Sequence, residues 1–266
     1  MKQTTCRAGM LLLFACTAWS VRAGTVIQQQ ERVPGEDEVR QEVTLYVDAG
    51  KLRVEGDNPE SGKYLVIFDQ AKQVAWMADL AKGTYMEFTA AQVQGMANQM
   101  QDAMKQMEEQ MANLPPAQRA MMEQMMQGRM GNAVAPAVSV QQKATGETVG
   151  QFVCTRYAVL TDGQLTQEVC AAPADQLQLD PSAFETFKAL AAFYEPLTRQ
   201  VPRGNWAAPN GMSQIPGFPV QTVRYEGQQP SSEWRLVKIE NRSLDAALFT
   251  LPAGLKKTEM PAMPAM

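Results

Sequence analysis

Residues 43–55 read VTLYVDAGKLRVE, two runs in which apolar and polar side chains alternate around Asp48-Ala49-Gly50. A period of two residues is typical of a strand with one buried face, and a short turn rich in Asp and Gly joins two such strands into a hairpin. Further strands are predicted at residues 64–68, 73–77 and 84–88. Strands that follow one another through short turns predict an antiparallel sheet.

After these strands the pattern becomes helical. Thr89-Ala90-Ala91-Gln92 has the spacing of a capping box, in which a hydroxyl residue is followed three positions later by Glu or Gln. This predicts a helix that extends to about Ala112. Pro115-Pro116 separates it from a second helix at about residues 117–127, because proline cannot continue a helix but can open the next one. The two helices would form a hairpin inserted between strands at about residues 89–130.

Cys154 and Cys170 lie in a second predicted hairpin, on either side of Thr161-Asp162-Gly163. A three-residue loop ending in a left-handed glycine would place the two cysteines directly opposite each other. A two-residue Asp-Gly turn would place them diagonally, still within bonding reach. Both geometries predict a disulfide; a redox-active pair is the alternative, although the CxxC spacing of such sites is missing.

The rest of the chain predicts a covering helix, two more strands and a tail. The helix begins at Asp180-Pro181 and ends or kinks at Pro196. Its predicted apolar face consists of Phe184, Phe187, Leu190, Ala191 and Tyr194. The remaining predictions are a loop at 202–217, strands at 220–225 and 234–240, a closing segment at 249–254 and a disordered tail at 257–266. Residues 24–256 are therefore expected to form a single domain.

Residues 1–23 have the features of a secretory signal peptide. A basic start is followed by an apolar stretch at residues 8–20. Val21-Arg22-Ala23 then resembles the A-x-A-like site that a signal peptidase recognises, which predicts cleavage before Gly24. The apolar stretch is shorter than the about 20 residues of a membrane-spanning helix. Leu13-Phe14-Ala15-Cys16 also resembles a lipobox, and lipidation of Cys16 is the alternative to a free mature protein. Both outcomes predict a periplasmic location.

The composition excludes several classes of function. The chain contains no histidine, so it cannot build a Ser-His-Asp triad, a histidine-containing catalytic zinc site or an imidazole base. Removing the three basic residues of the signal leaves 21 basic against 28 acidic residues, a net charge of −7. A chain this acidic has no electrostatic footprint for nucleic acid. No nucleotide-binding or nucleophile motif is present either. We therefore expect a protein that is not an enzyme and has no resident cofactor.

Four segments carry a resemblance to an exported bacterial family of unknown function: residues 45–54, 83–88, 154–157 and 249–254. That family often has a Met-rich helical insert. It is more distantly similar to the outer-membrane lipoprotein carrier-like superfamily, whose members are curved antiparallel half-barrels that shelter acyl chains beneath covering helices. The resemblance spans roughly residues 40–256. It implies an α+β fold, a curved antiparallel half-barrel with a Met-rich helical hairpin and a further covering helix.

Methionines form a stripe on the first predicted helix. Five of the 18 methionines follow one another at spacings of four, four, three and four residues: Met96, Met100, Met104, Met107 and Met111. At about 100° per residue they lie on one narrow face. The second predicted helix adds Met121, Met122, Met125 and Met126.

Three interpretations of these methionines remain open. The stripe could be an ordinary packed face, since an apolar stripe at helical spacing normally faces a core. It could be an adaptable surface for a lipid, a lipopeptide or the acyl chain of an envelope lipoprotein, with peripheral membrane contact as a further option. It could also bind Cu(I) or Ag(I), because thioethers are soft ligands; the candidates are Met100, Met104, Met107, Met111, Met121 and Met125. We expect non-enzymatic binding of an apolar ligand, with Cu(I) binding or chaperone-like holding of unfolded envelope proteins as alternatives.

Overall fold

The computed structural model describes residues 24–36, 38–59, 61–115, 118, 137–177, 179–198 and 214–259. The predicted signal peptide and Cys16 lie outside these residues, and so does the second predicted helix apart from residue 118.

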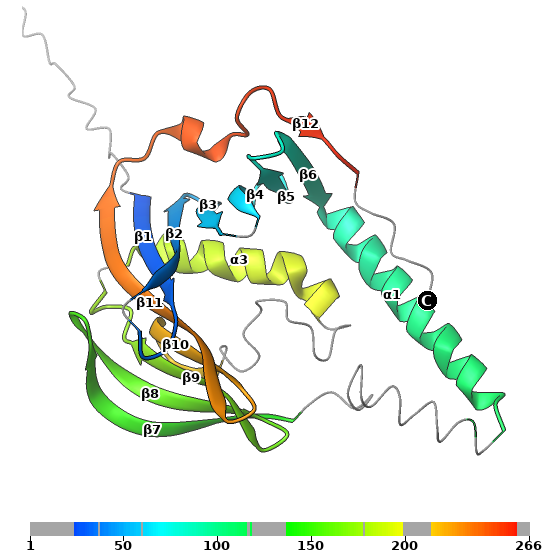
Figure 1. Ribbon diagram of the computed structural model, residues 1–266. Coiled ribbons are helices and arrows are strands. Elements are labelled where there is room, and N and C mark those ends of the chain that lie inside the picture. The colour runs from blue at the N-terminus through cyan, green and yellow to red at the C-terminus, as the bar shows by residue number, and fades with distance from the viewer. Residues whose placement is uncertain are drawn as a thin grey trace, which may run out of the picture.

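Twelve strands form one large, curved and unclosed sheet (Figure 1). The order of the strands is β12-β6-β5-β4-β3-β2-β1-β11-β10-β9-β8-β7, and every neighbouring pair is antiparallel except β12 with β6. The strands are β1 (Gly24–Arg32), β2 (Val39–Asp48), β3 (Lys51–Asn58), β4 (Gly62–Asp69), β5 (Val74–Asp79), β6 (Thr84–Thr89), β7 (Val138–Val149), β8 (Phe152–Thr161), β9 (Gln164–Ala172), β10 (Phe218–Glu226), β11 (Gln229–Arg242) and β12 (Lys256–Lys257).

Two meanders make up this sheet, and β1 joins them. Strands β2 to β6 are neighbours in chain order, and so are β7 to β11, while β1 pairs with both β2 and β11. Helix α1 (Ala90–Ala112) follows β6, and helix α3 (Pro181–Thr198) lies between β9 and β10 in the chain. The expected α+β fold with a curved antiparallel sheet is confirmed at this level.

The opening hairpin forms as predicted. Asp48 pairs with Lys51, so the turn contains only Ala49 and Gly50, with φ angles of 47° and 78°. Two consecutive positive φ angles match the right-handed twist of the flanking strands. The three strands predicted after this hairpin are also present, as β4, β5 and β6.

Three strands lack a sequence prediction. β1 reads GTVIQQQER and β7 reads VSVQQKATGETV, and in both the glutamines and charged residues interrupt the apolar alternation. β1 is nevertheless central, because it pairs with both β2 and β11, and its Val26 and Ile27 are buried. The short β12 contains Lys257, where the tail predicted as disordered begins; residues 260–266 of that tail lie outside the described residues.

Helix α3 lies inside the curve of the sheet (Figure 1). Its first turn is capped by Asp180, whose carboxylate accepts a hydrogen bond from the Ser182 backbone N–H at 2.7 Å. Pro196 does not end the helix, which continues to Thr198, because a proline in the last turn removes only one backbone donor. The buried positions are Ala183, Thr186 and Phe193, whereas the predicted face member Ala191 is exposed.

Apolar side chains pack on both faces of the sheet. On the side of α3, one cluster surrounds the disulfide and a second includes Val47, Leu52, Phe68 and Phe193. Phe187 packs against both clusters, so α3 connects them. Leu65, Ile67 and Ala78 form a separate cluster that is covered by Leu251 and Leu255 of the C-terminal segment. The 3-10 helix η2 (Ala246–Phe249) leads into that segment, and its Leu248 carbonyl accepts a hydrogen bond from Arg53 at 2.6 Å.

Candidate functional site

Helix α1 begins where the capping box predicts. The Thr89 hydroxyl accepts a hydrogen bond from the Gln92 backbone N–H at 3.2 Å, and the Gln92 side chain accepts one from the Thr89 N–H at 2.8 Å. Both bonds satisfy backbone donors that would otherwise lack a partner in the first turn. At the other end, the Asn113 side-chain amide donates to the Glu109 carbonyl at 2.9 Å.

The first half of α1 is packed into the protein. Val93 and Ala97 are 0% and 2% exposed, and Met96 packs against the apolar cluster that includes Val93. This cluster also contains Phe193 of α3, so the two helices share one apolar interface. The prediction that a helical apolar stripe faces the core therefore applies to Met96.

The stripe continues beyond this interface. Met100, Met104, Met107 and Met111 follow Val93 and Ala97 at spacings of three and four residues, which places all six side chains within about 80° of the helix circumference at about 100° per residue. The four methionines are half-buried, and none belongs to the apolar clusters formed by the described residues. In Figure 1 the second half of α1 extends away from the sheet. We call these four residues the methionine stripe from here on.

A shallow groove lies beside the start of α1. It has a volume of about 350 Å³ and is open to solvent. Its walls come from α1, from α3 and from the turn between β4 and β5: Gln70, Gln73, Ala90, Gln94, Ala189, Ala192, Phe193 and Pro196. The walls combine apolar surface with three glutamines and contain no charged side chain, which suits an uncharged or apolar group.

The second set of predicted site residues cannot be placed beside the first. Met121, Met122, Met125 and Met126 lie outside the described residues. Within the described part of the chain, no three His, Cys, Asp or Glu side chains lie close enough together to hold a metal ion.

Of the described helices, none has both the length and the hydropathy that a membrane crossing requires.

Cys154 and Cys170 form the predicted disulfide, with their Cα atoms 5.5 Å apart. Thr161 pairs with Gln164, so the hairpin has the two-residue turn Asp162-Gly163, with φ angles of 51° and 79°. A register shift follows, and the residue opposite Cys170 is Arg156. The cysteines are therefore diagonal neighbours, and the facing arrangement from a three-residue loop is wrong. Both are buried, which shields the bond from solvent thiolates.

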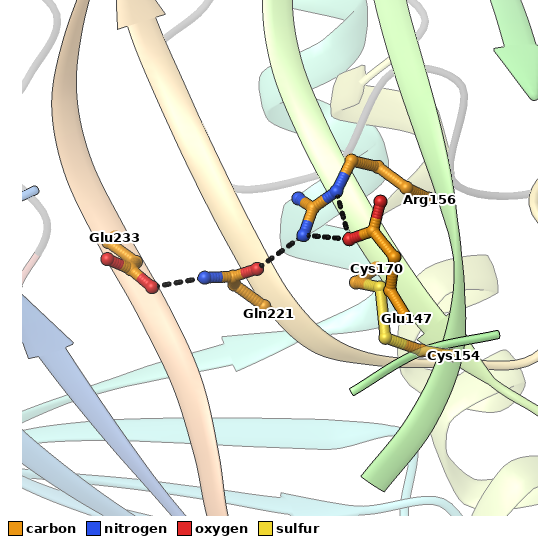
Figure 2. The surroundings of a disulfide bond; sticks show 6 residues. All are labelled: Glu147, Cys154, Arg156, Cys170, Gln221 and Glu233. Carbon is orange, nitrogen blue, oxygen red and sulfur yellow. Dashed lines mark hydrogen bonds and ion pairs between the residues drawn. A yellow bond between two sulfur atoms is a disulfide. The ribbon is translucent and has the colours of Figure 1, made fainter. Parts of the chain in front are cut away.

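A chain of polar contacts crosses the sheet beside the disulfide (Figure 2). Arg156 on β8 donates to Glu147 on β7 at 2.6 Å and to the Gln221 side chain on β10 at 3.1 Å. Gln221 in turn donates to Glu233 on β11, which also pairs with Arg235. No sequence pattern predicted this network, because its members come from four strands and each looks like an ordinary polar strand residue.

The charges of this network are compensated within it. The hydrogen bond to Glu147 raises the pKa of Arg156. Glu233 is only 4% exposed; burial alone would raise its pKa, but the hydrogen bonds from Arg235 and Gln221 bring the pKa below its ordinary value. A carboxylate held ionised by two donors is suited to tying strands together rather than to proton transfer.

Comparisons with known proteins place the chain in a family. The model of the family described as "Domain of unknown function (DUF4412)" matches residues 89–255, which begin at the cap of α1 and end in the C-terminal segment. The segments at 45–54 and 83–88 lie outside that match. No curated protein matches the chain by sequence.

One solved structure, described as "Structure of PNGF-II in P21 space group", is similar at 8% sequence identity and a TM-score of 0.38. The similarity covers 90% of this chain but only 32% of that one, so the chain spans about a third of its length. A similarity this low carries no argument about fold or function. The family match covers more than half of the sequence, and the chain therefore belongs to the DUF4412 family of unknown function.

Proposed function

We propose that this chain is an exported, non-enzymatic binding protein for an apolar ligand: a lipid, a lipopeptide or the acyl chain of an envelope lipoprotein. One observation carries the proposal. The apolar face of α1 continues from the buried Val93 and Ala97 into four half-buried methionines that no described core cluster includes. These side chains keep some solvent-accessible apolar surface outside the described core, which an apolar ligand can cover.

The chemistry of the side chains supports the same proposal. Methionine is unbranched and polarizable, so it adapts to ligands of irregular shape. Each apolar side chain that a ligand covers contributes about 1.5–3 kcal/mol when fully buried. The groove between α1 and α3 adds uncharged surface beside the first turns of the helix.

A periplasmic location is also part of the proposal. A signal peptide cleaved before Gly24 would release the protein into the periplasm, and lipidation of Cys16 would tether it there. In either form, acyl chains of the envelope are available to it. A curved sheet with a helix inside its curve is also the arrangement by which lipoprotein carrier-like proteins shelter such chains, and we extend that role to this chain.

A matched pair of variants tests the proposal. Replacing Met100, Met104, Met107 and Met111 with serine should weaken binding of a fluorescent fatty acid at least about tenfold, since about 1.4 kcal/mol is a factor of ten. Replacing the same four residues with leucine should preserve binding to within about threefold, because leucine keeps the volume and the apolar surface. Equal binding by the wild type and the serine variant would contradict the proposal. Native mass spectrometry of protein purified from the envelope would identify the natural ligand.

Cu(I) binding is the second candidate, favoured by one feature of α1. Met100 with Met104, and Met107 with Met111, are i and i+4 pairs on one continuous helix, where side chains are neighbours. Two thioethers can converge on a soft ion. The leucine variant separates the candidates: it should lose Cu(I) in competition with a chelator if the metal is the ligand. Cu(I) binding that survives in the leucine variant would exclude these methionines as the metal site.

A further inference from the structure

The groove beside α1 has hydrogen-bonding capacity but no charge of its own. The Gln73 amide donates to the Gln70 carbonyl at 2.8 Å, and the Gln94 amide donates to the Asn98 side-chain oxygen at 2.9 Å. A glutamine amide has two N–H donors and one carbonyl acceptor. Within the described part of the chain, one N–H and the carbonyl of Gln73 and of Gln94 therefore remain for a ligand.

Charged side chains near the groove are paired with one another. In the turn between β4 and β5, the buried Asp69 carboxylate accepts a hydrogen bond from the Lys72 backbone N–H at 3.1 Å. The Lys72 ammonium lies 3.4 Å from the same carboxylate and over the Trp76 ring. On α3, Lys188 pairs with Glu185 at 2.8 Å. None of these charges lines the groove, so it offers a carboxylate no compensating cation.

The start of α1 and the wall formed by α3 also disfavour an anion. Free backbone N–H groups at a helix start commonly bind carboxylates and phosphates. Here the Ala90 N–H donates to the Gln73 carbonyl at 3.2 Å, and the capping box occupies a second donor. Next to Phe193, burial raises the pKa of Tyr194 to about 12, so this part of α3 strongly disfavours a negative charge.

The groove borders the methionine stripe along the same helix. At about 100° and about 1.5 Å per residue, Met104 lies about 40° around α1 from Ala90 and about 15 Å along it from Gln94. The C-terminal half of α3 forms the opposite wall of the groove (Figure 1). A ligand whose polar end lies in the groove can therefore place its acyl chain on the stripe.

We propose that the groove binds the uncharged carbonyl of an acyl ester or acyl amide, and that the protein prefers such ligands to free fatty acids. This preference rests on the proposed function, in which the stripe holds the acyl chain. The glutamines donate N–H groups to the ligand carbonyl and accept from an amide N–H or a hydroxyl of its head. A carboxylate in the same place would lose hydration without gaining a cation.

Three ligands with the same lauroyl chain test the preference: laurate, monolauroylglycerol and N-lauroylethanolamine. Each is used to displace a fluorescent fatty acid from the wild type at pH 7, where laurate is ionised. The uncharged ligands should bind at least about tenfold more tightly than laurate, since only laurate must desolvate a charge. A preference for only one of them would also support the proposal and would identify the linkage as ester or amide. Binding of laurate as tight as that of both would overturn it.

A matched pair of lysine variants separates the groove from the general hydrophobicity of uncharged ligands. Gln94→Lys places a cation in the groove and should tighten laurate binding at least about threefold, without tightening the binding of the uncharged ligands. Gln99→Lys adds the same charge at an exposed position about 140° away around α1 and should leave laurate binding within about twofold of wild type. Equal effects of the two variants on laurate would overturn the role of the groove.

The serine variant of the methionine stripe keeps this proposal distinct from the proposed function. If that variant weakens binding of all three ligands, while Gln94→Lys affects laurate no more than Gln99→Lys does, the proposed function stands and the role of the groove is overturned. If the wild type binds none of the three ligands, the proposed function fails and the role of the groove fails with it.

Discussion

Glu233 carries its carboxylate almost entirely inside the protein, and three neighbours compensate for that burial. Gln221 and Arg235 donate hydrogen bonds to it, and the charge of Arg32 also favours its ionised form. A buried carboxylate without such donors would take up a proton instead. The lowered pKa of Glu233 therefore links the stability of the sheet to pH.

Replacing Glu233→Gln should lower the free energy of unfolding at pH 7 by about 1.5–3 kcal/mol, the range for a hydrogen bond to a charged group. Since the folded pKa lies below the ordinary value of 4.5, this contribution is complete above that value and is lost as the pH falls through the folded pKa. Urea unfolding from pH 7 to pH 3 should show the difference between wild type and variant narrowing in acid. A constant difference would contradict the assignment. The exposed Glu185→Gln is the control and should behave as wild type.

At the scale of single elements, α1 depends on both local and distant interactions. Its start is determined locally, by the reciprocal bonds of Thr89 and Gln92. Its first half is then held by Val93 and Met96, which pack in the apolar cluster that contains Phe193 of α3. Its second half has no such partner among the described residues, so the capped first turn is an important anchor for the whole helix.

Replacing Thr89→Ala should lower the free energy of unfolding by about 1 kcal/mol, because it removes the acceptor for the Gln92 N–H. In thermal unfolding this corresponds to a decrease of about 2–4 °C in Tm for a chain of this size. Thr89→Ser keeps the hydroxyl and is the matched control. Equal Tm values for the alanine and serine variants would show that the capping bond contributes nothing to stability.

At the scale of the whole molecule, α3 connects the two meanders. Phe187 packs against the disulfide cluster and against the cluster beneath the first meander, and its ring centroid lies 6.3 Å from that of Phe218. Phe193 lies 5.4 Å from Phe68 by the same measure. The sheet is unclosed, so these contacts inside its curve supplement the strand pairing through β1.

Replacing Phe187→Ala should cost about 3 kcal/mol, the lower end of the range for aromatic truncations, because the ring is only partly buried. The midpoint of denaturant unfolding, followed by circular dichroism, measures the change. Lys188→Ala alters an exposed neighbour on the same helix and should change stability by less than about 0.5 kcal/mol. A Phe187→Ala midpoint equal to that of the control would show that α3 does not join the two clusters energetically.

The elements whose signals are local could be predicted from the amino-acid pattern alone. The hairpin at residues 43–55 follows from alternation around the turn residues Asp48-Ala49-Gly50, and the start of α1 follows from a capping box of four residues. The disulfide was predictable because both candidate turns bring Cys154 and Cys170 within reach. The register shift after the turn, between Val159 and Leu160, was not predicted from the hairpin's sequence.

Features that depend on residues far apart in the chain are visible only in the folded protein. β1 lies at the centre of the sheet because strands from both meanders pair with it, although its glutamines hide the alternation. The contacts from Glu147 to Glu233 join four strands that no local pattern brings together. The spacing of the methionines was evident from the sequence, but their burial was not. Met96 packs in the cluster that contains Phe193 of α3, whereas the methionine stripe beyond it is half-buried and lies outside the described clusters.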